Sequence, residues 1–364
     1  MRRERALAAI RLEPTDRIPH WESLSNPSFE QAHTGIDPWE HPRLARKRLL
    51  EMLPIDVGGV PESDERIQKL PDGELTFEDS EGRKQARWGT GKTWHWDWGH
   101  RFRSIEDALA YDPLEDMDLR GKGLVADYDY RLSVEELAAQ FQSELDADRQ
   151  ATGELALVIP SFYNTLFMWP LLTFGWELML ELGALHQEAM KRLLAQFAEL
   201  SRKAFQAWAK TDTEAFVSHD DICFARGPVF RPEWLREMIY PYYEEFWGYL
   251  RANGTKVIFI SDGNVDLVAD DIFACGADGI RSEPYTDWRA MGRKHPDKAM
   301  IGDGDNRALM TNDRGAIRKM VKNMADFGKD LPGYFFGIGN HIPWNVPVEA
   351  VQAYFEASQE FGTR

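Results

Sequence analysis

A short apolar run that stops abruptly in polar residues constrains the fold of this chain more than any other feature. Residues 256–260 read Lys-Val-Ile-Phe-Ile, and residues 261–264, Ser-Asp-Gly-Asn, follow at once. An apolar, β-branched run of this length is typical of a strand that is buried on both faces. Because residues 265–274 are compatible with a helix, the stretch predicts a strand, a polar loop and a helix. In parallel α/β proteins such a loop lies at the carboxyl end of the strands, where ligands bind.

The same pattern recurs along the chain, which decides its fold class. Short apolar runs, most of them separated by helix-compatible segments, lie at residues 18–21, 54–60, 154–159, 215–218, 256–260, 279–282, 299–302 and 333–337. Eight such runs predict a (β/α)8 barrel, or TIM barrel, in the α/β class. The alternative is a doubly wound open sheet, which would need a glycine-rich phosphate loop after its first strand, and the sequence has none there.

We expect one domain over residues 1–364, with an insertion at about residues 61–150. Within the insertion, residues 75–79 and 83–88 flank Ser-Glu-Gly and predict an antiparallel hairpin. Residues 94–100, Trp-His-Trp-Asp-Trp-Gly-His, follow it. Such a dense aromatic segment is either a lid over a ligand or packing that closes one end of the barrel, and we favour the packing.

Charge and cysteine content restrict the classes of partner. The net charge of −17 argues against nucleic acids and anionic membranes, because both repel an acidic surface. No apolar run approaches the ~20 residues that span a bilayer, and the charged N-terminus does not resemble a signal peptide. Two cysteines, Cys223 and Cys275, are too few for a disulfide framework. We therefore expect a cytoplasmic protein.

Polar side chains follow nearly every predicted strand. A parallel barrel brings the residues after its strands to one rim, so we expect them to converge on one pocket. Each residue also has a structural explanation: an Asp after a strand often caps the next helix, and a single His is often only a hydrogen-bonding residue. The set favours a functional site, and it consists of His20, Glu22, Tyr163, Asn164, His219, Asp220, Asp221, Asp262, Asn264, Glu283, Asp303, Asp305, Asn340 and His341.

Eight short motifs are distributed over nearly the whole chain. They lie at residues 5–9, 13–19, 220–221, 232–237, 241–243, 261–266, 302–309 and 345–351. Together they resemble the uroporphyrinogen decarboxylase superfamily, which also includes methyltransferases that serve corrinoid proteins. The resemblance is specific for the superfamily, not for one branch of it.

Two departures from the family patterns bear on function. Zinc-bearing methyltransferases of this superfamily read His-x-Cys-Gly-Asn where this chain has Ile260 and Asp262 at the ligand positions, so zinc is not expected. The decarboxylase has an arginine-rich segment that would fall near residues 20–27, which contain no Arg here. A tetrapyrrole with many carboxylates needs such cations, so this departure disfavours uroporphyrinogen decarboxylation.

The resemblance implies an enzyme, and three hypotheses follow. The leading one is a methyltransferase or demethylase that acts on a small methylated substrate, with cobalamin carried by a separate corrinoid protein. The second is a lyase, a decarboxylase of a small or tetrapyrrole carboxylic acid, and the third is a catalytically degenerate binding protein. No tightly bound cofactor is expected, and a homodimer is left open.

Methyl loss from an ether or amine requires a proton on the heteroatom, so a general acid is needed. The expected catalytic residues are Asp262, His341, His219 and Asp221. The residues expected to bind the substrate are His20, Glu22, Tyr163, Asn164, Asn264, Glu283, Asp303, Asp305 and Asn340.

Overall fold

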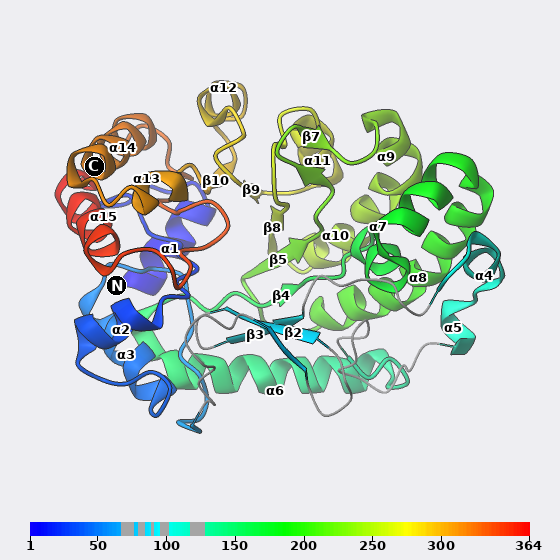
Figure 1. The fold of residues 1–364 in the computed structure, drawn as a ribbon, viewed down its shortest axis with the longest axis horizontal. Coiled ribbons are helices and arrows are strands. Elements are labelled where there is room, and N and C mark those ends of the chain that lie inside the picture. The colour runs from blue at the N-terminus through cyan, green and yellow to red at the C-terminus, as the bar shows by residue number, and fades with distance from the viewer. Residues whose placement is uncertain (67–75, 79–83, 89–90, 95–101, 117–127) are drawn as a thin grey trace.

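A computed structural model describes residues 1–66, 76–78, 84–88, 91–94, 102–116 and 128–364 (Figure 1). Its centre is a parallel sheet of five strands in the order β10–β9–β8–β5–β4. The strands are β4 (Ser161–Phe162), β5 (Ala215–His219), β8 (Lys256–Ile260), β9 (Gly279–Arg281) and β10 (Ala299–Ile301). β5 and β8 pair along their whole length, from Ala215 opposite Lys256 to His219 opposite Ile260.

Three further segments close this sheet into a ring through single parallel bridges. Tyr334 bridges to Met300 of β10, and Phe336, two residues later, bridges to His20. The next residue, Trp21, bridges to Val57, which in turn bridges to Leu157, just before β4. The eight parallel segments confirm the predicted (β/α)8 barrel, and seven of them coincide closely with the predicted strands.

The third segment differs from its prediction. We expected a strand at residues 154–159, but Gly153–Leu155 form a turn of 3-10 helix, and β4 begins only after Pro160. Glycine at position 153 ends the preceding helix with φ of +60°. The turn that follows includes residues 154–155, the first two residues of the predicted strand. The result is a barrel segment that starts later and ends at Phe162.

The interior of the barrel is apolar and is closed at one end by the first helix. Side chains that alternate along the strands, such as Val217, Ile258 and Ile301, face one another inside the ring. Ala6, Leu7, Ala9 and Ile10 of α1 (Arg2–Ile10) pack against this cluster. The amino-terminal end is therefore filled by a helix, which leaves the opposite end for a site.

The other helices surround the barrel in Figure 1. They are α2 (Pro27–Thr34), α3 (Pro42–Met52), α4 (Ile105–Ala110), α5 (Pro113–Asp116), α6 (Val134–Thr152), α7 (Met168–Leu185), α8 (Gln187–Trp208), α9 (Pro232–Met238), α10 (Tyr240–Ala252), α11 (Ala269–Cys275), α12 (Trp288–Lys294), α13 (Asn306–Met310), α14 (Arg314–Gly328) and α15 (Val348–Phe361). A short hairpin, β6 (Cys223–Phe224) and β7 (Gly227–Pro228), follows β5. None of the described helices combines the length and the apolar character needed to cross a bilayer.

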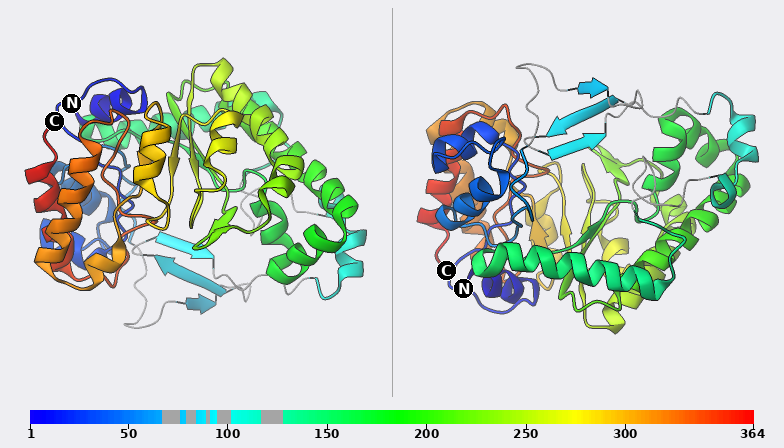
Figure 2. Two further views of the ribbon diagram at one scale, coloured as in Figure 1. Left: turned by 90° about the horizontal axis from the view of Figure 1, so that it is seen from above. Right: turned by 90° about the horizontal axis from the view of Figure 1, so that it is seen from below.

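The insertion contains the predicted hairpin and one more strand. β1 (Thr76–Glu78) pairs antiparallel with β2 (Lys84–Trp88), which also pairs with β3 (Gly91–Trp94). In both views of Figure 2 this small sheet lies on the side of the barrel opposite α1. Of the predicted aromatic segment, residues 95–100 lie outside the described residues, so the choice between lid and packing stays a prediction.

Candidate active site

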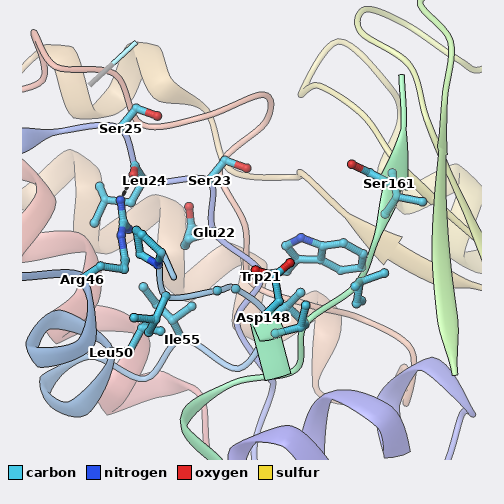
Figure 3. Close-up of a pocket in the computed structure, with 18 of the residues that line it drawn as sticks. Trp21, Glu22, Ser23, Leu24, Ser25, Arg46, Leu50, Ile55, Asp148 and Ser161 are labelled. Carbon is cyan, nitrogen blue, oxygen red and sulfur yellow. Dashed lines mark hydrogen bonds between the residues drawn. The ribbon is translucent and has the colours of Figure 1, made fainter. Parts of the chain in front are cut away.

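A cavity of about 680 Å³ opens at the carboxyl ends of the first barrel segments (Figure 3). We call it the barrel cavity. Its apolar wall includes Trp21, Val57, Val217 and Ile260, and its outer part reaches α2 and α3. Of the strand-end residues predicted from sequence, Glu22 and His219 line this cavity.

His219 ends β5 and is held by a carboxylate two residues later. Its Nε2 lies 3.0 Å from Oδ1 of Asp221. Burial disfavours the charged imidazole, but the attraction and the hydrogen bond of Asp221 outweigh burial and raise the pKa of His219. The ring of Tyr163 contacts the imidazole edge to face, with ring centres 4.5 Å apart. His219 is thus held in a fixed orientation at the cavity wall, and its neighbour Asp221 favours the protonated form of its imidazole.

Asp221 is the centre of a hydrogen-bond network. It accepts from the hydroxyl of Tyr163 at 3.1 Å and from the backbone amide of Asp262 at 3.0 Å, in addition to its contact with His219. Burial alone would raise the pKa of Asp221, but the charge and hydrogen bond of His219, together with these donors, lower it. The carboxylate of Asp221 therefore favours the protonated form of His219 and fixes the orientation of its ring.

Asp262 and His341 do come together, although they lie far apart in sequence. The side-chain amide of Asn340 donates to Asp262 at 3.2 Å, and its oxygen lies 2.6 Å from Nδ1 of His341. Burial and repulsion from Asp221 and Glu283 raise the pKa of Asp262 to about 7, whereas burial and the charge of Arg281 lower the pKa of His341 to about 4. This group lies beside the barrel cavity and is not part of its lining.

The loop after β8 is fixed by its glycine. Gly263 has φ of +83°, and a Cβ there would lie 2.4 Å from the backbone of Phe224. Its amide donates to Glu283 at 2.7 Å, and Asn264 donates to the backbone oxygen of Tyr285 at 2.8 Å. Glu283 and Asn264 therefore hold the loop that carries Asp262. In the structure they contact backbone groups and are not at the cavity wall.

The remaining expected substrate-binding residues lie elsewhere. His20 is buried against the rings of Phe336, Tyr354 and Phe355, outside the barrel cavity, and burial lowers its pKa to about 3. Asn164 is buried behind β4, where its backbone oxygen accepts from Ser201.

Asp303 and Asp305 are also remote from the barrel cavity. Asp303 pairs with Arg289 and accepts from Tyr334, and Asp305 caps α13 by accepting from the amide of Arg307. Helix capping, the structural alternative for Asp305, is what the structure shows at that position.

Two features of the site were missed in the sequence. Arg281, the last residue of β9, lines the barrel cavity and donates to Ser23 and to the backbone oxygen of Asn340. It lay inside a predicted strand and was therefore not counted among strand-end residues. An arginine in a strand predicted to be buried on both faces was the available signal. Arg46, from α3, also lines the cavity. The residues predicted at the strand ends include no Lys or Arg, so the cavity contains more cations than they indicated.

The residues at the family's zinc positions do not fit zinc. Ile260 packs against the apolar cluster inside the barrel, and a lone carboxylate remains at Asp262. The nearby thiol of Cys223 has its pKa raised to about 12 by burial, which disfavours the thiolate that zinc binds. Among the described residues, no group of three or more His, Cys, Asp or Glu side chains is arranged to hold a metal ion.

Comparisons with known proteins agree with this architecture. A methyltransferase from Methanosarcina mazei has the same fold, with a TM-score of 0.64 and 15% sequence identity over 99% of this chain and 98% of its own. A protein assigned as a vitamin-B12-independent methionine synthase from Listeria monocytogenes gives a TM-score of only 0.41 at 15% identity, covering 60% of this chain and 69% of its own. No curated protein sequence matches. The sequence profile of uroporphyrinogen decarboxylase matches residues 175–361, which is just over half of the chain. The chain therefore belongs to the uroporphyrinogen decarboxylase family.

Proposed function

We propose that this protein is a methyltransferase that removes a methyl group from a small methylated compound and passes it to a corrinoid carried by a separate protein. The observation that carries the proposal is the position of His219 at the wall of the barrel cavity, with its Nε2 3.0 Å from Oδ1 of Asp221. Full-length similarity to the fold of a methyltransferase is consistent with it but shows the fold alone.

The chemistry follows from the charge of His219. When a methyl–oxygen or methyl–nitrogen bond breaks, the electron pair of the bond stays on the heteroatom, and the methyl group bonds to the acceptor. A proton delivered to the heteroatom turns a poor leaving group into a neutral alcohol or amine. His219 donates this proton, Asp221 stabilises the imidazolium, and solvent reprotonates His219 afterwards. The hydroxyl of Tyr163 holds Asp221 in place.

The charges of the cavity disfavour the decarboxylation of a large tetrapyrrole. Among the described residues that line it, the arginines are Arg46 and Arg281, and the acids Glu22, Glu30 and Asp148 also face it. Arg46 is already paired with Glu30 at 2.9 Å. A ligand with many carboxylates would therefore meet more acids than available cations.

A second candidate, decarboxylation of a small acid, is favoured by Arg281, a buried cation able to hold one carboxylate. The two reactions give different products. Purified protein would be incubated with free cob(I)alamin and a panel of methoxy and N-methyl compounds, and methylcobalamin would be measured by mass spectrometry. The same mixtures would be assayed for released carbon dioxide. Methylcobalamin supports methyl transfer, whereas carbon dioxide without methylcobalamin supports the second candidate.

Asp221→Asn tests the proton donor. Without the carboxylate the pKa of His219 falls, so the protonated donor is lost at lower pH. We expect turnover at neutral pH to fall by about 10²–10⁴-fold, the usual contribution of general acid catalysis, and the alkaline limb of the pH profile to move to lower pH. An unchanged limb would show that His219 is not the donor. Glu283→Gln, which alters a carboxylate of the same rim that lies outside the cavity lining, is the matched control.

A further inference from the structure

Arg281 is a cation that the fold buries at the cavity wall. It pairs through the backbone with both neighbouring strands, opposite Ile260 of β8 and Ile301 of β10. Its exposed fraction is only 6%, yet it lines the barrel cavity. Arginine is rarely buried to this extent unless it is paired with an acid, so its partners decide its role.

The partners of Arg281 inside the protein are neutral and use one nitrogen. Nη2 donates to Oγ of Ser23 and to the backbone oxygen of Asn340, both at 2.8 Å. Among the described residues, no carboxylate lies within 4.0 Å of the guanidinium, and Nε and Nη1 donate to none of them. The ring of Trp21 lies 5.7 Å from the guanidinium carbon. Nε and Nη1, which lie on different edges of the guanidinium, are thus left as separate donors for a ligand.

The charges of the neighbouring acids Glu22 and Asp262 favour the charged form of Arg281, but neither carboxylate forms an ion pair with it in the described part of the chain. Glu22 turns its oxygens to the backbone amide of Ile338 and the hydroxyl of Tyr354, and burial raises its pKa to about 7. Asp262 is held by Asn340 instead. By contrast, Arg46 in the same cavity has an ion pair with Glu30. Arg281 is therefore a buried cation without an ion pair among the described residues.

We propose that Arg281 is an anion-binding subsite and that the ligand of the barrel cavity is a small monocarboxylate. Its carboxylate accepts a charge-assisted hydrogen bond from Nη1, a nitrogen that donates to none of the described residues. The hydrocarbon part packs against Trp21, Val57 and Val217. A second carboxylate would meet Glu22, Glu30 or Asp148, which restricts the ligand to a single negative charge.

This subsite also relates the ligand to the proton-transfer groups. Asn340 accepts from Arg281 through its backbone and donates to Asp262 through its side chain, and His219 lines the same cavity. A carboxylate at Arg281 therefore anchors one end of a small molecule and leaves the other end for His219. Under the proposed function, on which this last step rests, the substrate class is a methylated small carboxylic acid.

Binding measurements test the subsite without any turnover. The probes are benzoate, 4-methoxybenzoate and the neutral isostere 4-methoxybenzamide, with calorimetry and thermal shift as readouts. We expect the carboxylates to bind wild type and the amide to bind far more weakly. Arg281→Gln should weaken carboxylate binding by about thirtyfold or more, because a buried charge pair is lost. Arg46→Gln, the control in the same cavity, should change it by less than about threefold, because Arg46 is already paired.

The folded state of the variant provides a second readout. Removing a buried cation that has no acidic partner should leave the melting temperature of ligand-free Arg281→Gln equal to or above that of wild type. The proposal is overturned by equal binding of acid and amide, by wild-type affinity in Arg281→Gln, or by no binding of any carboxylate. Carboxylate binding that depends on Arg281, without methyl transfer, would reject the proposed function alone. Methyl transfer from neutral compounds only would reject the subsite alone.

Discussion

Replacing Asp262 with Asn should make the protein more stable at alkaline pH and change its stability little at acidic pH. In the folded protein the pKa of Asp262 is raised from its ordinary value of 3.8 to about 7, first by burial and then by repulsion from Asp221. Between these two values the folded state binds a proton that the unfolded state has released. The free energy of unfolding of wild type therefore falls as the pH rises through this window.

The size of the effect follows from the two values. One pKa unit is worth about 1.4 kcal/mol, so a rise from 3.8 to about 7 amounts to about 4 kcal/mol at pH 8. Asn has no titrating proton, but its side-chain oxygen still accepts the hydrogen bond from Asn340. The difference in unfolding free energy between Asp262→Asn and wild type should therefore grow by up to about 4 kcal/mol from pH 4 to pH 8.

Urea unfolding at each pH unit, followed by circular dichroism, measures this difference directly. Asp266→Asn is the control, because it removes a carboxylate from the exposed part of the same loop. If the difference for Asp262→Asn stays constant within about 1 kcal/mol over the whole range, Asp262 is not held protonated by its surroundings. Burial and repulsion from Asp221 and Glu283 would then not raise the pKa of Asp262.

Two backbone features give further predictions. Gly263→Ala should destabilise the protein by roughly 3 kcal/mol or more in urea unfolding, because its Cβ would meet the backbone of Phe224, whereas Gly254→Ala, with the same φ of +83° and nothing within 4 Å, should cost only about 1 kcal/mol. Equal losses would show that the close approach is relieved at no cost. Asp220→Ala should cost about 3 kcal/mol, because this carboxylate accepts from the amides of residues 166–168 and from the hydroxyl of Tyr243. A loss below about 1 kcal/mol would contradict this bonding role.

The barrel could be predicted from sequence because its strands are short, apolar and separated by helices. The runs at residues 256–260 and 299–302 carry this signal without ambiguity. The third strand was predicted only in part. Leu157 bridges to Val57 within the ring, but the predicted start of the strand at residues 154–155 is a turn of 3-10 helix, a conformation that the apolar pattern does not distinguish from a strand.

The site could be predicted only in part, because sequence reports where a residue lies along a strand but not what its side chain contacts. Asp221 and Asp305 both follow strands, yet one is the centre of a hydrogen-bond network beside the cavity and the other caps a helix. His20 and Glu22 also look equivalent in sequence. Only Glu22 reaches the cavity, because His20 faces the layer between the barrel and α15. Long-range contacts decided each of these cases.

Two walls of the barrel differ in their strand pairing, and each contributes different residues to the site. β5 and β8 are hydrogen-bonded along their full length and deliver His219 and the loop of Asp262. The opposite wall, with Trp21 and Val57, is joined by single bridges and supplies much of the cavity lining. Under the proposed function, proton transfer requires a donor held within hydrogen-bond distance of its target, and the fully paired strands hold His219 at a fixed place in the ring. Recognition of the hydrocarbon part of a ligand depends on shape, which the apolar side chains of Trp21 and Val57 supply on the opposite wall.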